Sequence, residues 1–143
     1  MSDNTVLKLL GRRLRLAVIG GGPGSFIGAM HRQAARLDDR YELVAAALSS
    51  DPQRSRNAGI GIGLVPERCY PSGRILIEVE SGRMDGAEVV AVMTPNDSHF
   101  DFAMQALNRG LDVICDKPMT NTMDEALALH QSCLLYTSDA ADE

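Results

Sequence analysis

The apolar residues of the chain fall into two kinds of segment. Short continuously apolar runs, typical of strands buried on both faces of a sheet, span residues 14–20, 43–48, 88–93 and 112–115. Segments with the apolar spacing or the start and stop signals of helices span residues 25–37, 52–58, 72–81, 97–109 and 121–130. This alternation predicts an α/β fold, a doubly wound parallel sheet with helices on both faces. Right-handed crossovers then bring the carboxyl ends of the strands to one edge, where such folds bind ligands.

Several boundaries carry their own signals. Asp51 followed by Pro52 is typical of a helix cap and a first helical residue. The β-branched residues of the segment 72–81 are compatible with a strand, but its place in the alternation favours a helix. We also expect a short strand at residues 68–70, and a cap at Asn121 or Thr122 for the last helix.

Length and composition narrow the class of protein. The chain has 143 residues, 45% hydrophobic and 23% charged, which favours one ordinary domain with a real core. No apolar run approaches the ~20 residues that span a bilayer. The first ten residues lack the pattern of a signal peptide. We therefore expect a cytoplasmic protein that does not bind membranes.

The charge is unevenly distributed. The net charge is −5, although residues 1–40 hold seven Lys/Arg against three Asp/Glu. So acidic a chain is a poor general binder of nucleic acid, and we expect none. The basic N-terminal part is compatible with a small phosphorylated ligand, or simply with a solvated face.

The three cysteines do not form a recognisable site. Cys69, Cys115 and Cys133 are widely spaced, with no CxxC pair and no close histidine. This pattern argues against a disulfide framework and against zinc, so no metal site is expected. Cys115 is most simply a small buried hydrophobic residue.

A glycine-rich turn joins the first predicted strand to the first helix. Gly20, Gly22 and Gly24 permit positive φ and close approach of a ligand to the backbone. The N–H groups that open the helix, at Ser25, Phe26 and Ile27, carry partial positive charge and suit a pyrophosphate. The usual G-x-G-x-x-G spacing is not met, because its third position is Ser25. Gly28 can serve as the helix-packing glycine if the loop is three residues longer than usual.

The end of the second strand bears on the choice of dinucleotide. The common fingerprint has an acidic residue there, which holds the ribose hydroxyls. In this chain Ser49 or Ser50 stands at that position. Asp51 lies one or two residues further on and is better explained as a helix cap. Arg54 and Arg56 follow and can pair with a 2′-phosphate. The pattern therefore leans towards NADP, or towards use of both NAD and NADP.

Three segments together resemble the N-terminal half of the Gfo/Idh/MocA oxidoreductase family. They are VIGGGPGSFIGAMH at 18–31, VMTPNDSHFDFA at 92–103 and VICDKPMT at 113–120. The resemblance covers about residues 15–131, and it implies a Rossmann domain that binds NAD or NADP. It also implies hydride transfer between C4 of the nicotinamide and a hydroxyl or ketone carbon of a sugar-like or inositol-like substrate.

The resemblance also implies roles for particular residues. Thr94, Pro95 and Asn96 would lie beside the nicotinamide and its ribose, with His99 following in the same loop. His99 is equally compatible with a helix-start residue that touches no ligand.

The lysine motif carries the predicted chemistry. Lys117 matches the lysine of the family's Glu-Lys-Pro motif, which reaches between cofactor and substrate. A cationic amine there lowers the pKa of a reacting hydroxyl and stabilises developing negative charge. Asp116 stands where the family usually has Glu, so its charge is kept but its reach is shorter.

The expected organisation has three parts. Residues 1–13 form an N-terminal extension, residues 14–132 the NAD(P)-binding domain, and residues 133–143 a tail that we expect to be non-native. The tail sequence CLLYTSDAADE resembles the translation of a sequencing adapter. The resemblance implies a C-terminal α+β domain that holds the substrate pocket, and we expect this chain to lack it. The parent protein is then expected to be a homo-oligomeric dehydrogenase and this piece to be inactive alone. The alternative is a non-catalytic regulatory member of the family that binds NAD(P).

Overall fold

The computed structural model describes residues 3–141, with the side chains of residues 3–135. Four parallel strands form one sheet in the order β2–β1–β3–β4. They are β1 (Leu14–Gly20), β2 (Tyr41–Ala47), β3 (Val89–Met93) and β4 (Asp112–Cys115). Since the chain crosses from β2 past β1 to β3, the strand order reverses between β1 and β3. The predicted doubly wound α/β sheet is confirmed.

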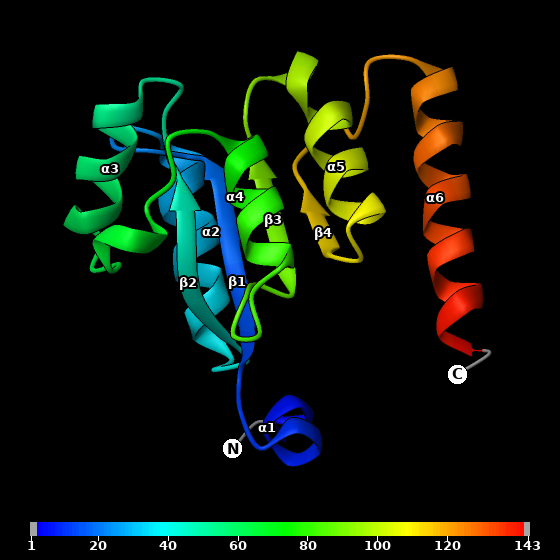
Figure 1. Cartoon of the computed structure of the whole chain (residues 1–143), viewed down its shortest axis with the longest axis horizontal. Coiled ribbons are helices and arrows are strands. Elements are labelled where there is room, and N and C mark those ends of the chain that lie inside the picture. The colour runs from blue at the N-terminus through cyan, green and yellow to red at the C-terminus, as the bar shows by residue number, and fades with distance from the viewer. Residues whose placement is uncertain (1–2, 142–143) are drawn as a thin grey trace.

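Helices cover both faces of the sheet. The helices are α1 (Thr5–Leu10), α2 (Phe26–Leu37), α3 (Pro52–Gly61), α4 (Gly73–Ser81), α5 (His99–Asn108) and α6 (Met123–Ala141), with 3₁₀ turns η1 (Pro66–Arg68) and η2 (Asn96–Ser98). Figure 1 shows α4 in front of the strands and α2 behind them, with α1 below the strands' amino ends. The carboxyl ends of all four strands therefore share the upper edge in that view.

Strand side chains alternate between two apolar layers. Ala17 and Ile19 of β1 point to the layer beneath α4 and α5, where Leu76 and Ala106 also lie. The intervening residues of the strand belong to the opposite layer, which includes Ile27 of α2. The central strands β1 and β3 therefore bury both faces, whereas Asp112 and Ile114 leave one face of the edge strand β4 exposed. This explains why the strands read as continuous apolar runs.

The short strand expected at residues 68–70 is wrong. Only one isolated parallel bridge forms there, between Ala46 and Cys69. Pro66 begins the η1 turn just before it, and Pro71 follows directly after Tyr70. Neither proline has an N–H to give to a ladder, so the pairing cannot extend. The helix favoured for residues 72–81 is confirmed as α4, capped by the hydroxyl of Ser72.

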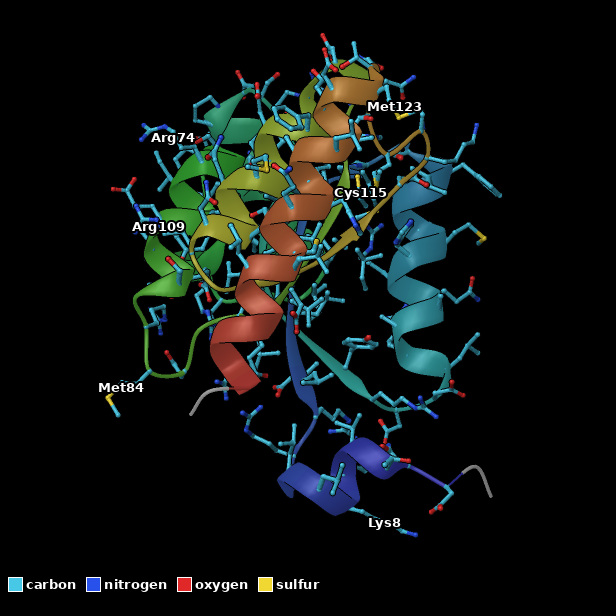
Figure 2. All side chains as sticks on the ribbon, turned by 90° about the vertical axis from the view of Figure 1, so that its right-hand side faces the viewer. Lys8, Arg74, Met84, Arg109, Cys115 and Met123 are labelled. Carbon is cyan, nitrogen blue, oxygen red and sulfur yellow. The ribbon has the colours of Figure 1, made fainter. Side chains whose placement is uncertain are left out.

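The last helix is longer than expected. It runs from Met123 to Ala141 and packs against α5, whereas the apolar spacing predicted an end near residue 130. No glycine or proline occurs between residues 131 and 141 to stop it. Figure 2 shows this helix facing the viewer, with Met123 at its start and Cys115 of β4 behind it. Thr122 caps it by accepting a hydrogen bond from the N–H of Glu125 at 3.2 Å.

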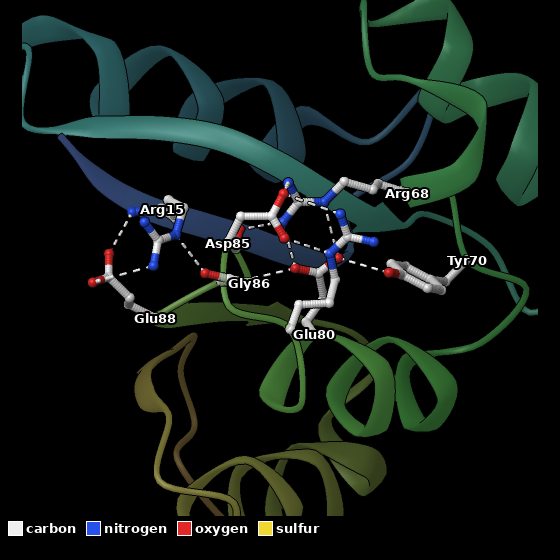
Figure 3. Close-up of polar contacts among 9 residues, drawn as sticks. Arg15, Arg68, Tyr70, Glu80, Asp85, Gly86 and Glu88 are labelled. Carbon is white, nitrogen blue, oxygen red and sulfur yellow. Dashed lines mark hydrogen bonds and ion pairs between the residues drawn. The ribbon is translucent and has the colours of Figure 1, made fainter. Parts of the chain in front are cut away.

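A buried ion pair ties η1, α4 and the start of β3 together (Figure 3). Glu80 is fully buried and accepts hydrogen bonds from Arg68 Nε at 3.0 Å and Nη2 at 2.6 Å. It also accepts from the Tyr70 hydroxyl at 2.7 Å and from the N–H of Ala87 at 2.9 Å. Burial alone would raise the pKa of Glu80, but these hydrogen bonds outweigh it and hold the pKa below its ordinary value. Burial and the neighbouring carboxylate raise the pKa of Tyr70.

A second carboxylate fastens the N-terminal segment to the sheet. Glu88 accepts bidentate hydrogen bonds from Arg12 at 2.9 and 2.7 Å, and one from the N–H of Arg15 at 2.9 Å. These contacts lower the pKa of Glu88 to about 2, although partial burial opposes the shift. The Arg15 side chain continues to the carbonyl of Gly86, 2.6 Å from its Nε (Figure 3).

The described residues show neither a membrane-spanning helix nor a cluster of metal ligands. Within the part of the chain that the structure describes, no helix is long and apolar enough to cross a bilayer. Among the side chains placed between residues 3 and 135, no three of His, Cys, Asp and Glu cluster as metal ligands would.

Candidate functional site

Strand register brings three predicted motifs to one edge of the sheet. Gly20, the last residue of β1, is the register partner of Met93 at the end of β3. On the other side of β3, Val92 is the partner of Cys115, and the N–H of Asp116 donates to the Val92 carbonyl at 3.0 Å. The glycine turn, the loop that starts at Thr94 and the Lys117 loop therefore leave the sheet side by side.

The glycine turn packs too closely for side chains. A Cβ at Gly20 would lie 2.8 Å from the carbonyl carbon and oxygen of Met93, and one at Gly22 would lie 2.3 Å from the Leu48 carbonyl oxygen. Gly20 and Gly24 have φ of +82° and +84°, which disfavour any other residue. At Gly24, an added Cβ would meet nothing within 4 Å, so this part of the turn has open space beside it.

Gly28 takes the role of the missing third glycine. It is buried in the first turn of α2, and an added Cβ would lie 1.8 Å from the carbonyl oxygen of Gly21. The turn is therefore three residues longer than the common fingerprint but still ends in close helix–strand packing. Ser25 caps α2 by accepting from the N–H of Gly28 at 3.2 Å.

The start of α2 is shaped to receive an anion. The first N–H groups of a helix have no intrahelical acceptor and carry partial positive charge. Ile27 is half-buried in the layer beneath α2, while 77% of Phe26 is exposed. Arg32, two turns further along, donates from Nη1 to the Gly21 carbonyl at 2.9 Å and so fixes the turn from behind.

Two clefts flank the glycine turn. The first, of about 600 Å³, opens where the strand order reverses. Its walls come from the ends of β1, β2 and β3 and from the start of α4, and include Gly20, Ser49, Ser50, Ser72, Thr94, Pro95, Ser98 and Phe102. The second, of about 650 Å³, lies between α2 and α3 and is lined by residues that include Gly22, Ser25, Arg32, Ser49 and Arg54. An elongated, partly apolar ligand with a central anion, such as a dinucleotide, suits clefts arranged in this way.

The structure separates the residues that follow β2. Ser49 borders both clefts and Ser50 borders the first. Asp51 caps α3, because its carboxylate accepts from the N–H of Arg54 at 2.7 Å, which confirms the expectation of a helix cap. Arg54 lines the second cleft, whereas Arg56 turns away and donates to the carbonyl of Pro66 at 3.3 Å.

The loop after β3 combines exposed and buried groups. Thr94 and Pro95 line the first cleft, and the Thr94 hydroxyl accepts from Ser98 at 2.7 Å. Asn96 begins η2 and is exposed. His99 is 1% exposed, and its ring nitrogens lie 2.7 Å from the carbonyl oxygens of Thr94 and Pro118. As placed, its ring does not border either cleft.

The lysine motif leaves the sheet at β4. Asp116 is half-buried and accepts from the N–H of Lys117 at 3.0 Å, while the Lys117 side chain is exposed. The peptide bond from Lys117 to Pro118 is cis. Burial and the charge of Asp116 raise the pKa of the Cys115 thiol, so that group stays neutral beside the loop.

Three residues of this edge went unnoticed in the sequence. Arg32 read as an ordinary polar residue of a helix, and Ser72 only as a helix start. Phe102 read as one apolar residue among others. The Arg32 guanidinium reaches the Gly21 carbonyl, and Phe102 packs against Gly73 of α4, where an added Cβ would lie 2.6 Å from the ring. Only the fold brings such pairs together.

Comparison with known proteins agrees with this geometry. The family model for Gfo/Idh/MocA, described as an oxidoreductase family with an NAD-binding Rossmann fold, matches residues 14–134. An uncharacterized oxidoreductase, YfiI, of Bacillus subtilis (strain 168) is 38% identical over 119 residues, which are 82% of this chain and 30% of that protein. The rhizopine catabolism protein MocA of Rhizobium meliloti is 32% identical over 114 residues, covering 80% of this chain and 32% of its own length.

Solved structures give the same picture. An inositol dehydrogenase homolog from Azotobacter vinelandii, complexed with NADH and myo-inositol, is 44% identical with a TM-score of 0.86. The match covers 88% of this chain and 33% of that one. An oxidoreductase from Pseudomonas syringae has the same TM-score at 37% identity, over 89% of this chain and 35% of its own. The chain thus spans about a third of the length of the relatives it matches.

Proposed function

The chain belongs to the Gfo/Idh/MocA family of oxidoreductases with an NAD-binding Rossmann fold, and we propose that it is the cofactor-binding part of a dehydrogenase for sugar-like or inositol-like substrates. The observation that carries the proposal is the common edge of the sheet. There the glycine turn, the Thr94 loop and the Lys117 loop leave adjacent parallel strands.

Different groups of the chain would bind different parts of NAD or NADP. The glycine turn and the first N–H groups of α2 suit the pyrophosphate, because they offer donors and partial positive charge without a side chain in the way. Ser49 and Ser50 supply hydroxyls to the ribose at the end of β2. Thr94 and Pro95 form the opposite wall of the same cleft. When bound, the nicotinamide supplies the site that accepts or returns the hydride.

Lys117 is the residue proposed for the chemical step. It follows β4 at the edge where the other two motifs meet, and its side chain is exposed. An ammonium group beside a reacting hydroxyl stabilises negative charge as that hydroxyl loses its proton. Substrate also has to be held against the nicotinamide, a task for the part of the relatives' length that lies beyond the matched third. In the full-length protein, Lys117→Ala should therefore lower kcat by about 10² or more while changing cofactor affinity much less.

The proposal can be tested on this chain by binding alone. NADH and NADPH are titrated against it, with cofactor fluorescence as the readout. Gly22→Ala places a methyl group against the Leu48 carbonyl and should weaken binding strongly. Gly82→Ala is the matched control, since an added Cβ there meets nothing closer than 3.7 Å and Gly82 lines neither cleft. A folded wild-type chain that binds neither cofactor would refute the proposal.

The substrate class needs a second measurement. A full-length protein is assayed with inositols, sugars and sugar acids, following NAD(P)H absorbance. Turnover of a sugar-like compound that Lys117→Ala abolishes is the expected result. Cofactor binding without turnover of any of these classes would favour the regulatory alternative.

A further inference from the structure

The His99 ring joins the two loops that flank the proposed site. His99 is the first residue of α5, and its ring is almost fully buried. Nε2 lies 2.7 Å from the carbonyl oxygen of Thr94, and Nδ1 lies 2.7 Å from that of Pro118. Thr94 begins the loop after β3, whereas Pro118 directly follows Lys117. One side chain therefore connects the wall of the first cleft to the lysine motif.

Both partners of the ring are hydrogen-bond acceptors. A backbone carbonyl oxygen cannot donate, and a neutral imidazole carries only one N–H. In the neutral form, one ring nitrogen would present a lone pair to an oxygen 2.7 Å away, which is repulsive. Only the imidazolium form, with two N–H groups, makes both contacts favourable.

Both carbonyl oxygens face the ring nitrogens at hydrogen-bond distance, which is the arrangement that two N–H donors need.

We propose that His99 is a doubly protonated clasp that holds the Lys117 loop against the Thr94 loop. It is a positioning residue, because its ring borders neither cleft and acts through the backbone of its two partners. Its clasping role stands on the two contacts alone, while its value for catalysis rests on the proposed function of Lys117. By fixing Thr94 and Pro118 together, it sets how the lysine approaches the cofactor cleft.

Nuclear magnetic resonance of the ring nitrogens tests the protonation directly. The chain labelled with ¹⁵N is studied near neutral pH, where exposed His130 provides an internal reference. The expected result is a His99 ring in which both nitrogens carry slowly exchanging protons. One protonated nitrogen and one lone pair would overturn the proposal. This measurement needs neither a variant nor a bound cofactor, so it is independent of the proposed function.

Two substitutions test the positioning role. His99→Gln keeps a donor with two N–H groups, whereas His99→Phe keeps a ring of similar shape with none. A clasp predicts that Phe weakens NADH binding roughly tenfold more than Gln, the fold-change of about one lost hydrogen bond. It also predicts faster amide exchange at Lys117 in the Phe variant, with unchanged exchange in β1. His130→Gln should change neither measurement.

The opposite pattern would identify a packing role. If His99→Phe leaves exchange at Lys117 and NADH affinity as in the wild type, the ring only fills space and the clasp is refuted. If the wild-type chain binds neither NADH nor NADPH, the proposed function fails, and the ring spectrum together with exchange at Lys117 still decides the clasp.

Discussion

Replacing Glu80 by Gln should be among the most damaging polar substitutions in this chain. The carboxylate is fully buried, and its two oxygens accept four hydrogen bonds from Arg68, Tyr70 and Ala87. Glutamine has nearly the same shape but turns one acceptor into a donor. That donor would face N–H groups that also donate, and the Arg68 guanidinium, whose side chain is only 11% exposed, would lose its counter-charge.

The magnitude follows from the burial of the pair. Breaking a buried ion pair by removing one partner costs about 3–5 kcal/mol. Domains of this size are stable by only about 5–15 kcal/mol, so at least about a fifth of the stability is at stake. The midpoint of thermal unfolding should fall by roughly 10 °C or more.

The assay is urea unfolding followed by circular dichroism, with Glu78→Gln as the matched control. Glu78 lies on the same helix and pairs with Arg74 at 3.4 Å, but both side chains are more than half exposed. Its substitution should cost no more than about 0.5 kcal/mol. If Glu80→Gln costs as little as Glu78→Gln, the buried network contributes nothing and this reasoning is refuted.

The other predictions concern the cofactor, the glycine turn and pH. Arg54→Gln should weaken NADPH binding roughly tenfold and leave NADH binding unchanged, while Arg56→Gln affects neither; equal effects of both variants in a fluorescence titration would contradict this assignment. Gly28→Ala should destabilise the chain in urea by at least ~1–3 kcal/mol, because its methyl group overlaps a backbone oxygen; Gly61→Ala, in an open helical position, should be neutral or slightly stabilising. The carboxyl of Glu88 has a folded pKa of about 2 against an ordinary 4.5, so its stabilisation is full above 4.5 and is lost as pH falls towards 2. In Glu88→Gln, the midpoint of thermal unfolding should fall less between pH 4.5 and pH 2 than in the wild type. An equal fall in both proteins would contradict this prediction.

The elements that sequence could predict are those whose signals are local. Continuous apolar runs identify the strands because both faces of the sheet are covered. The cap at Asp51 needs only a carboxylate three residues before an N–H that lacks a partner. The strand expected at residues 68–70 failed for an equally local reason, since Pro66 and Pro71 flank it and cannot donate to a ladder. The two prolines in the sequence already argue against a strand at this position.

The features that sequence could not predict depend on partners far along the chain. Glu80, in the run ILIEVE, shares the buried face of Leu76 and Ile77, but its spacing does not reveal its partner Arg68, which lies twelve residues earlier on a different element. Arg32 reads as exposed, while its guanidinium holds the carbonyl of Gly21. Periodicity assigns a face to each residue, but it does not say what occupies the space opposite. Buried charges and loop anchors are therefore the features that a single sequence conceals.

His99 shows how the two kinds of information combine at the candidate site. Sequence placed it beside Thr94 and Asn96 and left open whether it touches a ligand. The structure gives the ring two backbone partners from loops that are nineteen and five residues away. Because β3 and β4 are parallel neighbours, the loops that follow them emerge together, and a single buried ring can reach both. The topology that gathers ligands at this edge of the sheet thus also makes it possible for one side chain to set the distance between cofactor cleft and lysine.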